Sequence, residues 1–289
     1  MKMKDKKTII AAVGAGAILL IAIGIFIAYQ FIQKGDDKNL VSESETEITE
    51  EVTSILNTED TVLETTASQA TADFTSSAVN QFSTTAGSEQ DSFYSNSVFV
   101  GDSVMYGFER YITGRPGTLG DPMFLTAGSF AARIELTAPT SESPHPLYMG
   151  TKTQVCNALP LIGADKVFLF FGLNDIGMVG VDQTVANYQS VINNIRAQSP
   201  TIQIYIISTT YMAAGSELRT LNNSNIRLLN EQLQANAPVW GVGFVDVAKY
   251  MYDSSGCLVA GYSSDGYVHI TQSAYDLWVG VLRDFASKN

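Results

Sequence analysis

The sequence predicts an α/β fold in which one parallel sheet of five strands is covered by helices on both faces. From Ser92 onward, short apolar runs rich in β-branched and aromatic residues alternate with stretches whose apolar residues recur at helical spacing. This alternation is typical of a three-layer domain with a parallel sheet. Residues 92–289 are also numerous enough to enclose one continuous core.

The expected elements follow from these runs in chain order. The five strands are expected at residues 97–100, 123–126, 166–171, 203–208 and 243–247. The helices are expected at residues 104–111, 151–161, 181–198, 221–236 and 271–286. Open sheets of this kind bind ligands at the carboxyl ends of their strands. We therefore look for chemistry in the segments that directly follow the strands.

The charge is distributed unevenly among three segments. Residues 1–34 carry a net charge of +4, residues 35–91 a net charge of −12 and residues 92–289 a net charge of −4. The acidity of the chain therefore belongs mostly to the middle segment. A weakly acidic domain without a basic stripe lacks the electrostatic footprint of a nucleic-acid-binding protein, so we expect no nucleic-acid partner.

The first two segments predict a membrane anchor and a stalk. Residues 8–31 contain no charge and are long enough to cross a hydrocarbon core of roughly 30 Å. Four lysines precede this run, which predicts a single-pass protein of the cell membrane with a cytoplasmic N-terminus and an extracellular domain. The length of the run favours an uncleaved signal anchor over a cleaved signal peptide. Residues 35–91 are rich in Ser, Thr and Glu, and we expect them to form a disordered stalk.

The two cysteines leave two readings open. In an oxidising exterior, Cys156 and Cys257 could form one disulfide, or they could remain two buried thiols. Two cysteines and two histidines without clustered spacing argue against a zinc site. We expect no metal and no other cofactor.

Three polar motifs lie at the ends of predicted strands. GDS at 101–103 follows the first strand, GLND at 172–175 follows the third, and DGYVH at 265–269 lies beyond the fifth. Together they supply a hydroxyl nucleophile, an amide donor and an imidazole with a nearby carboxylate. These groups are the ones needed to cleave or transfer an acyl group.

The nucleophile and its base can be chosen from the residue types. Ser103 would lie at a helix N-terminus, although Asp102 and Ser103 taken alone could be only a turn and a helix cap. A serine nucleophile needs a base, and the chain has two histidines. His269 follows Asp265 by four residues, so the carboxylate could hold Nδ1 and turn Nε2 toward the serine. His145 lies between two prolines, where we expect it to be exposed to solvent or to make a loop contact.

Two further residues could stabilise an oxyanion. Asn174 follows the most apolar strand, where a side-chain amide needs a partner or a purpose. Gly128 follows the second strand, and its missing side chain would let its backbone N–H approach a ligand closely. An ordinary turn glycine is the alternative at this position.

These motifs carry a family resemblance. Residues 97–289 resemble the SGNH hydrolase superfamily, also called GDSL-type esterases and lipases. The GDS motif matches the first family block, with Val104 where the shortened family name has leucine, and Gly128 is the best match for the second block. GLND matches the third block and DGYVH the fifth.

The resemblance implies a fold, a mechanism and roles for these residues. The fold is a flavodoxin-like, doubly wound parallel sheet. The mechanism is a metal-free one with a triad of Ser103, His269 and Asp265. The oxyanion hole is formed by the backbone N–H groups of Ser103 and Gly128 and by the side chain of Asn174.

The function expected is a serine esterase that removes small acyl groups, such as acetyl, from cell-surface or extracellular glycans. An acyltransferase on cell-wall polysaccharides, which would use the same triad, and a non-catalytic surface binding module remain alternatives. Substrate contacts are expected from Arg133, His145 and Tyr148 in the 132–150 segment and from Tyr211 after the fourth strand. For each of them, an ordinary loop or packing role is the alternative.

Overall fold

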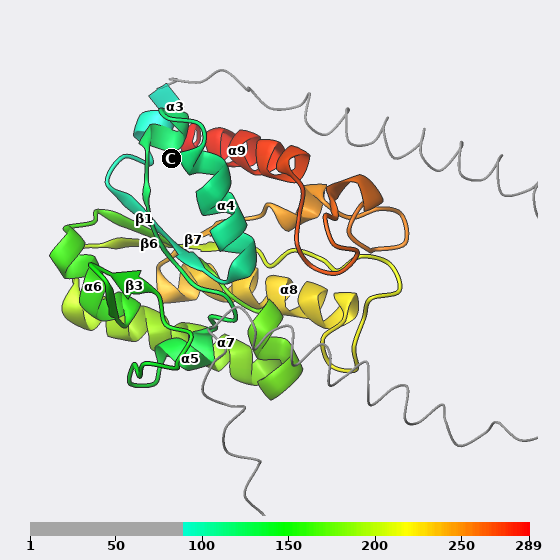
Figure 1. Ribbon diagram of the computed structural model, residues 1–289, viewed down its shortest axis with the longest axis horizontal. Helices are drawn as coiled ribbons and strands as arrows, with labels where there is room; N and C mark the ends of the chain where they lie inside the picture. The colour runs from blue at the N-terminus through cyan, green and yellow to red at the C-terminus, as the bar shows by residue number, and fades with distance from the viewer. Residues whose placement is uncertain (1–88) are drawn as a thin grey trace, which may run out of the picture. The chain divides into compact units, whose positions relative to one another are not determined.

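A computed structural model describes residues 89–289, and Figure 1 shows a twisted sheet at the centre of this part of the chain. The five strands of the main sheet are all parallel and lie in the order β2-β1-β5-β6-β7. In chain order they are β1 (Ser97–Gly101), β2 (Met123–Thr126), β5 (Lys166–Phe170), β6 (Gln203–Ile207) and β7 (Gly243–Val245). This strand order is the flavodoxin-like one. The predicted α/β fold with five parallel strands is confirmed.

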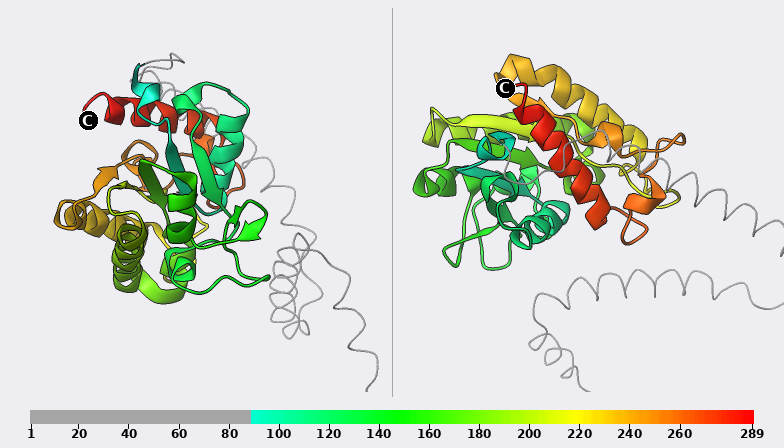
Figure 2. Two further views of the ribbon diagram at one scale, coloured as in Figure 1. Left: turned by 90° about the vertical axis from the view of Figure 1, so that its left-hand side faces the viewer. Right: turned by 90° about the horizontal axis from the view of Figure 1, so that it is seen from above.

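Helices cover both faces of this sheet, as Figures 1 and 2 show. Helices α4 (Ser103–Thr113) and α9 (Gln272–Ala286) pack together on one face. Helices α6 (Val155–Ile162), α7 (Leu173–Gln198) and α8 (Asn223–Trp240) cover the other face. The short helix α5 (Ala132–Glu135) packs against α7. The remaining short helices are α3 (Glu89–Ser92), η2 (Thr118–Gly120), η3 (Ala248–Tyr250) and η4 (Ala260–Tyr262).

Aromatic residues align across the central strands. Phe99 of β1 is opposite Phe168 of β5, and Phe168 is opposite Tyr205 of β6. The rings stack with centroids 4.6 Å apart in the first pair and 4.7 Å apart in the second. Cross-strand aromatic pairs contribute beyond the area they bury, by about 0.5–1.5 kcal/mol each. They fix the register of β1 and β5, the two strands after which Ser103 and Asn174 lie.

The structure differs from the prediction where a helix was expected from residue 151. Strands β3 (Leu147–Tyr148) and β4 (Thr151–Lys152) form an antiparallel hairpin there, and α6 begins only at Val155. The two residues between the strands, Met149 and Gly150, have φ angles of 49° and 79°. Left-handed conformations at both central residues are what a tight hairpin turn requires. The helix that was expected from residue 181 also begins earlier, at Leu173, and is interrupted at Gly180, where φ is 76°.

The folded part includes residues 89–91, which the sequence analysis assigns to the stalk. Asp91 of α3 is buried and forms a two-pronged ion pair with Arg283 of α9. The folded domain therefore includes at least residues 89–91 in addition to residues 92–289. The expected anchor at 1–34 and the rest of the stalk, residues 35–88, lie outside the described residues.

Three further expectations concern the described part. Within residues 89–289, no helix is long and apolar enough to span a bilayer. The same residues hold no group of three or more His, Cys, Asp or Glu side chains that could bind a metal ion. Cys156 and Cys257 are both free thiols, so the reading with two thiols holds, although only Cys156 is buried.

Candidate active site

Residues from the two ends of the folded domain meet at the carboxyl edge of the sheet. Ser103 begins α4 directly after β1, and His269 precedes α9 by three residues. The Oγ of Ser103 lies 2.9 Å from Nε2 of His269, although 166 residues separate the two in the chain. Nδ1 of the same imidazole lies 2.5 Å from Oδ2 of Asp265. The structure thus brings together the three residues that the sequence suggested as a triad.

The hydrogen-bond partners fix the tautomer of this imidazole. A carboxylate only accepts hydrogen bonds, so Nδ1 of His269 carries the proton that faces Asp265. Nε2 is then left with a lone pair to accept the hydroxyl proton of Ser103. The other carboxylate oxygen of Asp265 accepts the backbone N–H groups of Tyr267 and His269, at 2.8 and 3.2 Å. These bonds hold the carboxylate in place.

The histidine and aspartate lie at the surface. The side chain of His269 is 44% exposed and that of Asp265 is 33% exposed. Burial acts to raise the pKa of Asp265, but hydrogen bonds from the His269 ring and from backbone N–H groups outweigh it and hold this pKa below its usual value. Asp265 therefore stays ionised beside His269, where it stabilises the imidazolium that forms when the ring accepts a proton.

Two glycines allow the chain to turn at the ends of the central strands. A Cβ at Gly101 would lie 2.7 Å from both Cβ of Met105 and the carbonyl oxygen of Phe170, so only glycine lets α4 start directly after β1. Gly172 has a φ of 131° and precedes α7. Together they place Ser103 and Asn174 in the first turns of α4 and α7.

Asn174 is held by two acceptors. Its Nδ2 donates to Oδ2 of Asp102 at 3.1 Å and to the backbone carbonyl of Phe130 at 3.3 Å. Asp102 caps α4, because its Oδ1 accepts the N–H of Val104 at 2.9 Å. Burial raises the pKa of Asp102 to about 7, against the opposing effect of the Val104 N–H. From the sequence alone Asp102 is only a turn or cap residue, and its contact with Asn174 is evident only in the structure.

The segment that contains Gly128 lies beside Asn174. The N–H of Gly128 donates to no other group within residues 89–289. The next residue, Ser129, has a φ of 61°, and the buried ring of Phe130 packs edge-on against Phe171. The N–H of Ser103, the first residue of α4, likewise has no acceptor within its helix. The three groups suggested for an oxyanion hole are thus on neighbouring segments.

Asp175 holds the start of α5, directly after the Gly128–Phe130 segment, against the first turn of α7. The sequence did not indicate this role. Its two carboxylate oxygens accept the backbone N–H groups of Ala132 and Arg133, each at 3.0 Å. The carboxyl is fully buried, and burial raises its pKa while the N–H donors oppose the shift. It ties the start of α5 to the first turn of α7. The GLND motif contained this residue, but nothing in the sequence named its partners.

Of the two expectations for His145, exposure to solvent is wrong, whereas a loop contact is what the structure has. The residue is 1% exposed, its Nδ1 lies 2.8 Å from the hydroxyl of Ser143, and its ring faces that of Phe130 with centroids 5.9 Å apart. Burial lowers the pKa of His145, which favours the neutral ring. This histidine therefore packs against the Gly128–Phe130 segment through the Phe130 ring and does not face solvent.

The other three suggested substrate contacts lie in different surroundings. Tyr211 is buried, and its ring packs on Tyr252 and under the guanidinium of Arg227. This is the packing role that the sequence analysis gave as the alternative. Tyr148 is partly buried in the hairpin of β3 and β4. Arg133 is also partly buried, and its side chain forms no ion pair within residues 89–289.

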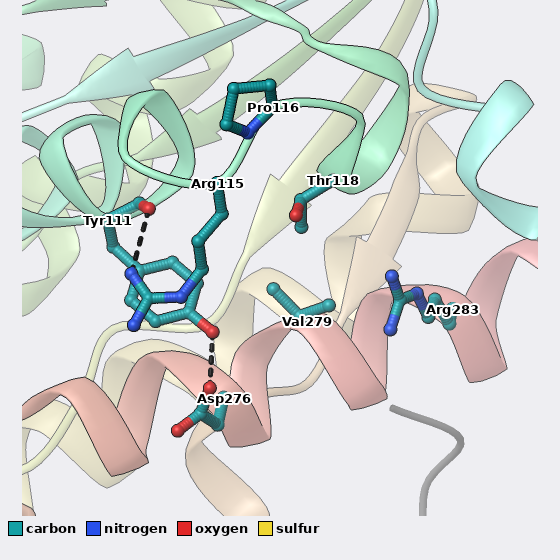
Figure 3. Close-up of a pocket in the computed structure, with 7 residues that line it drawn as sticks. All are labelled: Tyr111, Arg115, Pro116, Thr118, Asp276, Val279 and Arg283. Atoms are coloured by element: carbon teal, nitrogen blue, oxygen red, sulfur yellow. Dashed lines mark hydrogen bonds between the residues drawn. The ribbon is translucent and has the colours of Figure 1, made fainter. Parts of the chain in front are cut away.

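A pocket of about 340 Å³ lies between α4, η2 and α9, and Figure 3 shows its walls. No triad residue lines it. The hydroxyl of Tyr111 donates to Asp276 across the two helices, and Arg115 lies over the Tyr111 ring and donates to Gln272 at 3.1 Å. These bonds connect α4 and the residues just after it to α9. Ser103 is the first residue of α4, and His269 lies three residues before α9. The lining residues are Tyr111, Arg115, Pro116, Thr118, Asp276, Val279 and Arg283.

The fold is similar to those of several bacterial proteins of known structure. A GDSL-like lipase from Bacteroides thetaiotaomicron is 20% identical, with a TM-score of 0.50, over 66% of this chain and 87% of the other. A proposed acylhydrolase from Bacteroides fragilis is 22% identical, with a TM-score of 0.51, over 66% of this chain and 86% of the other. A proposed platelet activating factor from Streptococcus pneumonia is 20% identical, with a TM-score of 0.50, over 80% of this chain and 99% of the other. At these identities the likeness concerns the fold.

The family follows from the sequence match. No curated protein matches the chain. The GDSL-like lipase/acylhydrolase family matches residues 99–277, a range that contains Ser103, Asn174, Asp265 and His269. The chain therefore belongs to the GDSL-like lipase/acylhydrolase family and is an ester-hydrolysing enzyme.

Proposed function

We propose that the protein is a serine esterase that removes small acyl groups, acetyl above all, from cell-surface or extracellular glycans. The observation that carries this proposal is the continuous hydrogen-bond chain from Ser103 through His269 to Asp265. A hydroxyl, a base and an acid that orients the base are in contact, and this is the geometry that activates a serine nucleophile.

The reaction proceeds through an acyl-enzyme. His269 takes the proton of Ser103 as Oγ attacks the ester carbonyl, and Asp265 stabilises the resulting imidazolium. The imidazolium then gives its proton to the leaving sugar oxygen as the ester bond breaks. In the second half, His269 takes a proton from water as the water oxygen attacks the acyl carbonyl. The bond between the acyl carbon and Oγ of Ser103 then breaks, the imidazolium returns the proton to Oγ, and the carboxylic acid leaves.

Three donors stabilise the oxyanion that forms in each half. They are the backbone N–H groups of Ser103 and Gly128 and Nδ2 of Asn174. Neither backbone group is engaged elsewhere, and Asn174 lies beside both segments. Loss of one such donor typically raises the barrier by about 3 kcal/mol.

The exposure of the site supports a polymeric substrate with a small acyl group. With His269 44% exposed, an ester on a bulky chain can approach the nucleophile without having to enter a narrow tunnel. The expected membrane anchor and stalk, which lie outside the described residues, would place such a site among surface polymers. A short acyl group suits an open site because it leaves little apolar surface in water.

The same exposure favours one second function, an O-acyltransferase on cell-wall polysaccharide. In that reaction a sugar hydroxyl takes the place of water in the second half and also gives its proton to His269. The two reactions are distinguished by product analysis with an acetylated donor glycan, with and without an acceptor glycan. Free acetate in both samples supports the esterase, and acetylated acceptor supports the transferase.

The role of Ser103 is tested by substitution and by labelling. Ser103→Ala is expected to abolish hydrolysis of acetate esters with unchanged thermal unfolding, whereas Ser190→Ala on the exposed face of α7 keeps full activity. A serine-reactive phosphonate is expected to label the native protein but not the Ser103→Ala variant. Full activity of that variant would refute the assignment, and absence of labelling would revive a non-catalytic binding module.

A further inference from the structure

Among the arginines of residues 89–289 that are at least partly buried, Arg133 is the one whose side chain has no hydrogen-bond or ion-pair partner and no ring contact. Arg110 and Arg219 are exposed to solvent. Among the arginines of residues 89–289 that are at least partly buried, all the others have partners: Arg115 bonds Gln272, Arg196 bonds Gly241, Arg227 lies over Tyr211 and Tyr252, and Arg283 pairs with Asp91. Only the backbone N–H of Arg133 makes a hydrogen bond, to Asp175.

The guanidinium of Arg133 has its Nε turned toward the protein and its two terminal nitrogens in contact with solvent. Its Nε is buried and has no hydrogen-bond partner. Its two terminal nitrogens, which also lack protein partners, are absent from the buried unsatisfied atoms and so keep contact with solvent. A buried donor without a partner costs on the order of 1–3 kcal/mol, and such a group in a native fold calls for an explanation. The two outward nitrogens form the fork that binds a carboxylate or a phosphate through two parallel hydrogen bonds.

The position of Arg133 connects it to the reacting centre. It follows the Gly128–Phe130 segment by three residues, and its backbone is bonded to Asp175 at 3.0 Å. Asp175 directly follows Asn174, and Asn174 in turn bonds the carbonyl of Phe130 at 3.3 Å. The long side chain of Arg133 therefore starts from the same small bonded unit that carries two of the proposed oxyanion donors.

The acid bonded to the backbone of Arg133, Asp175, leaves the charge of the guanidinium available. Burial raises the pKa of Asp175 and the charge of Arg133 acts against this shift, but the two side chains form no ion pair within 4.0 Å. Both carboxylate oxygens of Asp175 are used by backbone N–H groups. No other acid of residues 89–289 forms an ion pair with Arg133.

We propose that Arg133 binds an anionic group, a carboxylate or a phosphate, that the acylated glycan carries next to its ester. The inference rests on the proposed function and narrows its substrate to acidic glycans. Arg133 is then a specificity residue: it binds the substrate and takes no part in proton transfer.

The first arm of the test measures binding by calorimetry in the full chain with the Ser103→Ala substitution, which removes turnover. The probes are an acetylated oligouronide, the same compound with its carboxyls methyl-esterified, and an acetylated glycan with and without a phosphate group. We expect one anionic probe to bind roughly 10- to 100-fold more tightly than its neutral partner, as for a hydrogen bond to a charged group. The anion that shows the difference identifies its chemistry. Equal affinity within both pairs would overturn the inference.

The second arm measures kcat/KM in the protein with Ser103 intact. Arg133→Gln is expected to abolish the preference for the anionic ester, because kcat/KM for the anionic ester falls by much more than kcat/KM for a neutral aryl acetate. Arg133→Lys is expected to keep part of the preference, because it retains the charge and loses the fork. Arg196→Gln, at the opposite end of α7 from Asn174, makes the same charge change and is the matched control.

The outcomes of the two arms can be told apart. An equal loss of activity on neutral and anionic esters in Arg133→Gln would mean a structural role and would overturn the inference. If the native protein cleaved no ester at all, the proposed function would fail, and the binding arm would still decide whether Arg133 recognises an anion.

Discussion

Asp102 uses its two carboxylate oxygens for two different contacts. One caps α4 through the N–H of Val104, and the other accepts Nδ2 of Asn174. An amide group has two N–H hydrogens, and here the second one is directed at the carbonyl of Phe130. To donate to an oxyanion, Asn174 must release Phe130 while Asp102 keeps the amide in orientation. Asp102 is thus a positioning residue for the proposed oxyanion hole.

The Asp102→Asn variant separates the two contacts. Asparagine caps a helix as well as aspartate does, so the thermal midpoint should change little. Its amide nitrogen would face the nitrogen of Asn174, which must then turn its oxygen inward. We expect kcat at pH 8 to fall about 10- to 100-fold with KM nearly unchanged. The variant should cost nothing further in an Asn174→Ala background, and an undiminished effect there would show that Asp102 acts through another group.

The rate of ester cleavage should fall in acid. His269 must be neutral to accept the Ser103 proton, so kcat/KM is expected to drop as the pH is lowered between about 8 and 5. Because hydrogen bonds hold the pKa of Asp265 below its usual value, that carboxylate stays ionised throughout this range. Asp102, whose pKa of about 7 lies in the same range, is separated from His269 by repeating the profile in the Asp102→Asn variant, which should keep the decline. A flat profile in the native protein would contradict the role of His269 as base.

Local spacing suggested the three residues of the proposed triad, which the structure brings into contact, but it did not indicate the residues that pack around them. Asp265 and His269 are four residues apart, and Ser103 was placed by the strand before it. In contrast, Asn174 meets a carbonyl 44 residues away, and His145 is buried because Phe130 packs against it. Contacts of this kind depend on how segments distant in sequence pack. No pattern of neighbouring residues specifies them.

At the level of elements, hydrophobic runs predicted the strands well and the starts of two helices, α6 and α7, poorly. Each of the five strands was placed within two residues of its observed ends, because β-branched and aromatic residues fill the buried sheet. The first turns of α7 were missed because Gly177 and Gly180 interrupt the helical pattern there. Residues 151 and 152 were assigned to a helix because the turn conformation of Met149 is not evident from its residue type.

Glu135 links two elements and should make stability depend on pH. Its buried carboxyl accepts the N–H groups of Val155 and Cys156 at the start of α6, at 2.9 and 3.1 Å. Burial raises the pKa of Glu135 to about 7, although these N–H donors act against the shift. Between the usual glutamate value of about 4.3 and a pKa of about 7, the folded chain holds a proton that the unfolded chain has lost. The contribution of Glu135 to stability is therefore present in acid and is lost as the pH rises through 7.

Urea denaturation at several pH values tests whether the free energy of unfolding falls as the pH rises. The free energy of unfolding of the native protein should fall from pH 5 to pH 8, and Glu135→Gln, which cannot ionise, should show a smaller fall. Asp102 and Asp175 have pKa shifts in the same direction and leave part of the slope in place. An identical slope in the variant would mean that Glu135 is ionised in the fold at both pH values.

For the whole molecule, topology explains why one site can form from distant residues. Ser103 follows β1 and Asn174 follows β5, two neighbouring strands between which the strand order changes direction. Crevices at such switch points are where doubly wound folds bind ligands. His269 reaches the same edge because α9 packs against α4, so the distance between base and nucleophile depends on that packing.

The ion pair between Asp91 of α3 and Arg283 of α9 should stabilise the position of α9 in the fold. Both side chains are buried, and the pair joins the first described helix to α9 across 192 residues of sequence. Asp91→Ala removes the carboxylate partner of a buried guanidinium and should lower the free energy of unfolding by about 3–5 kcal/mol. The double variant Asp91→Leu with Arg283→Met should recover most of this loss, because it removes both charges. Lys288→Ala, which breaks the exposed pair with Asp284 on the same helix, should hardly change it.

The same pair predicts where a stable fragment must begin. A fragment of residues 92–289 lacks Asp91 and should unfold at a lower urea concentration than one of residues 85–289, even though both contain every residue of the proposed active site. Since α9 sets the position of His269, the shorter fragment should also lose ester-cleaving activity at a lower urea concentration. Equal unfolding midpoints for the two fragments would show that the Asp91–Arg283 pair contributes nothing net to the fold.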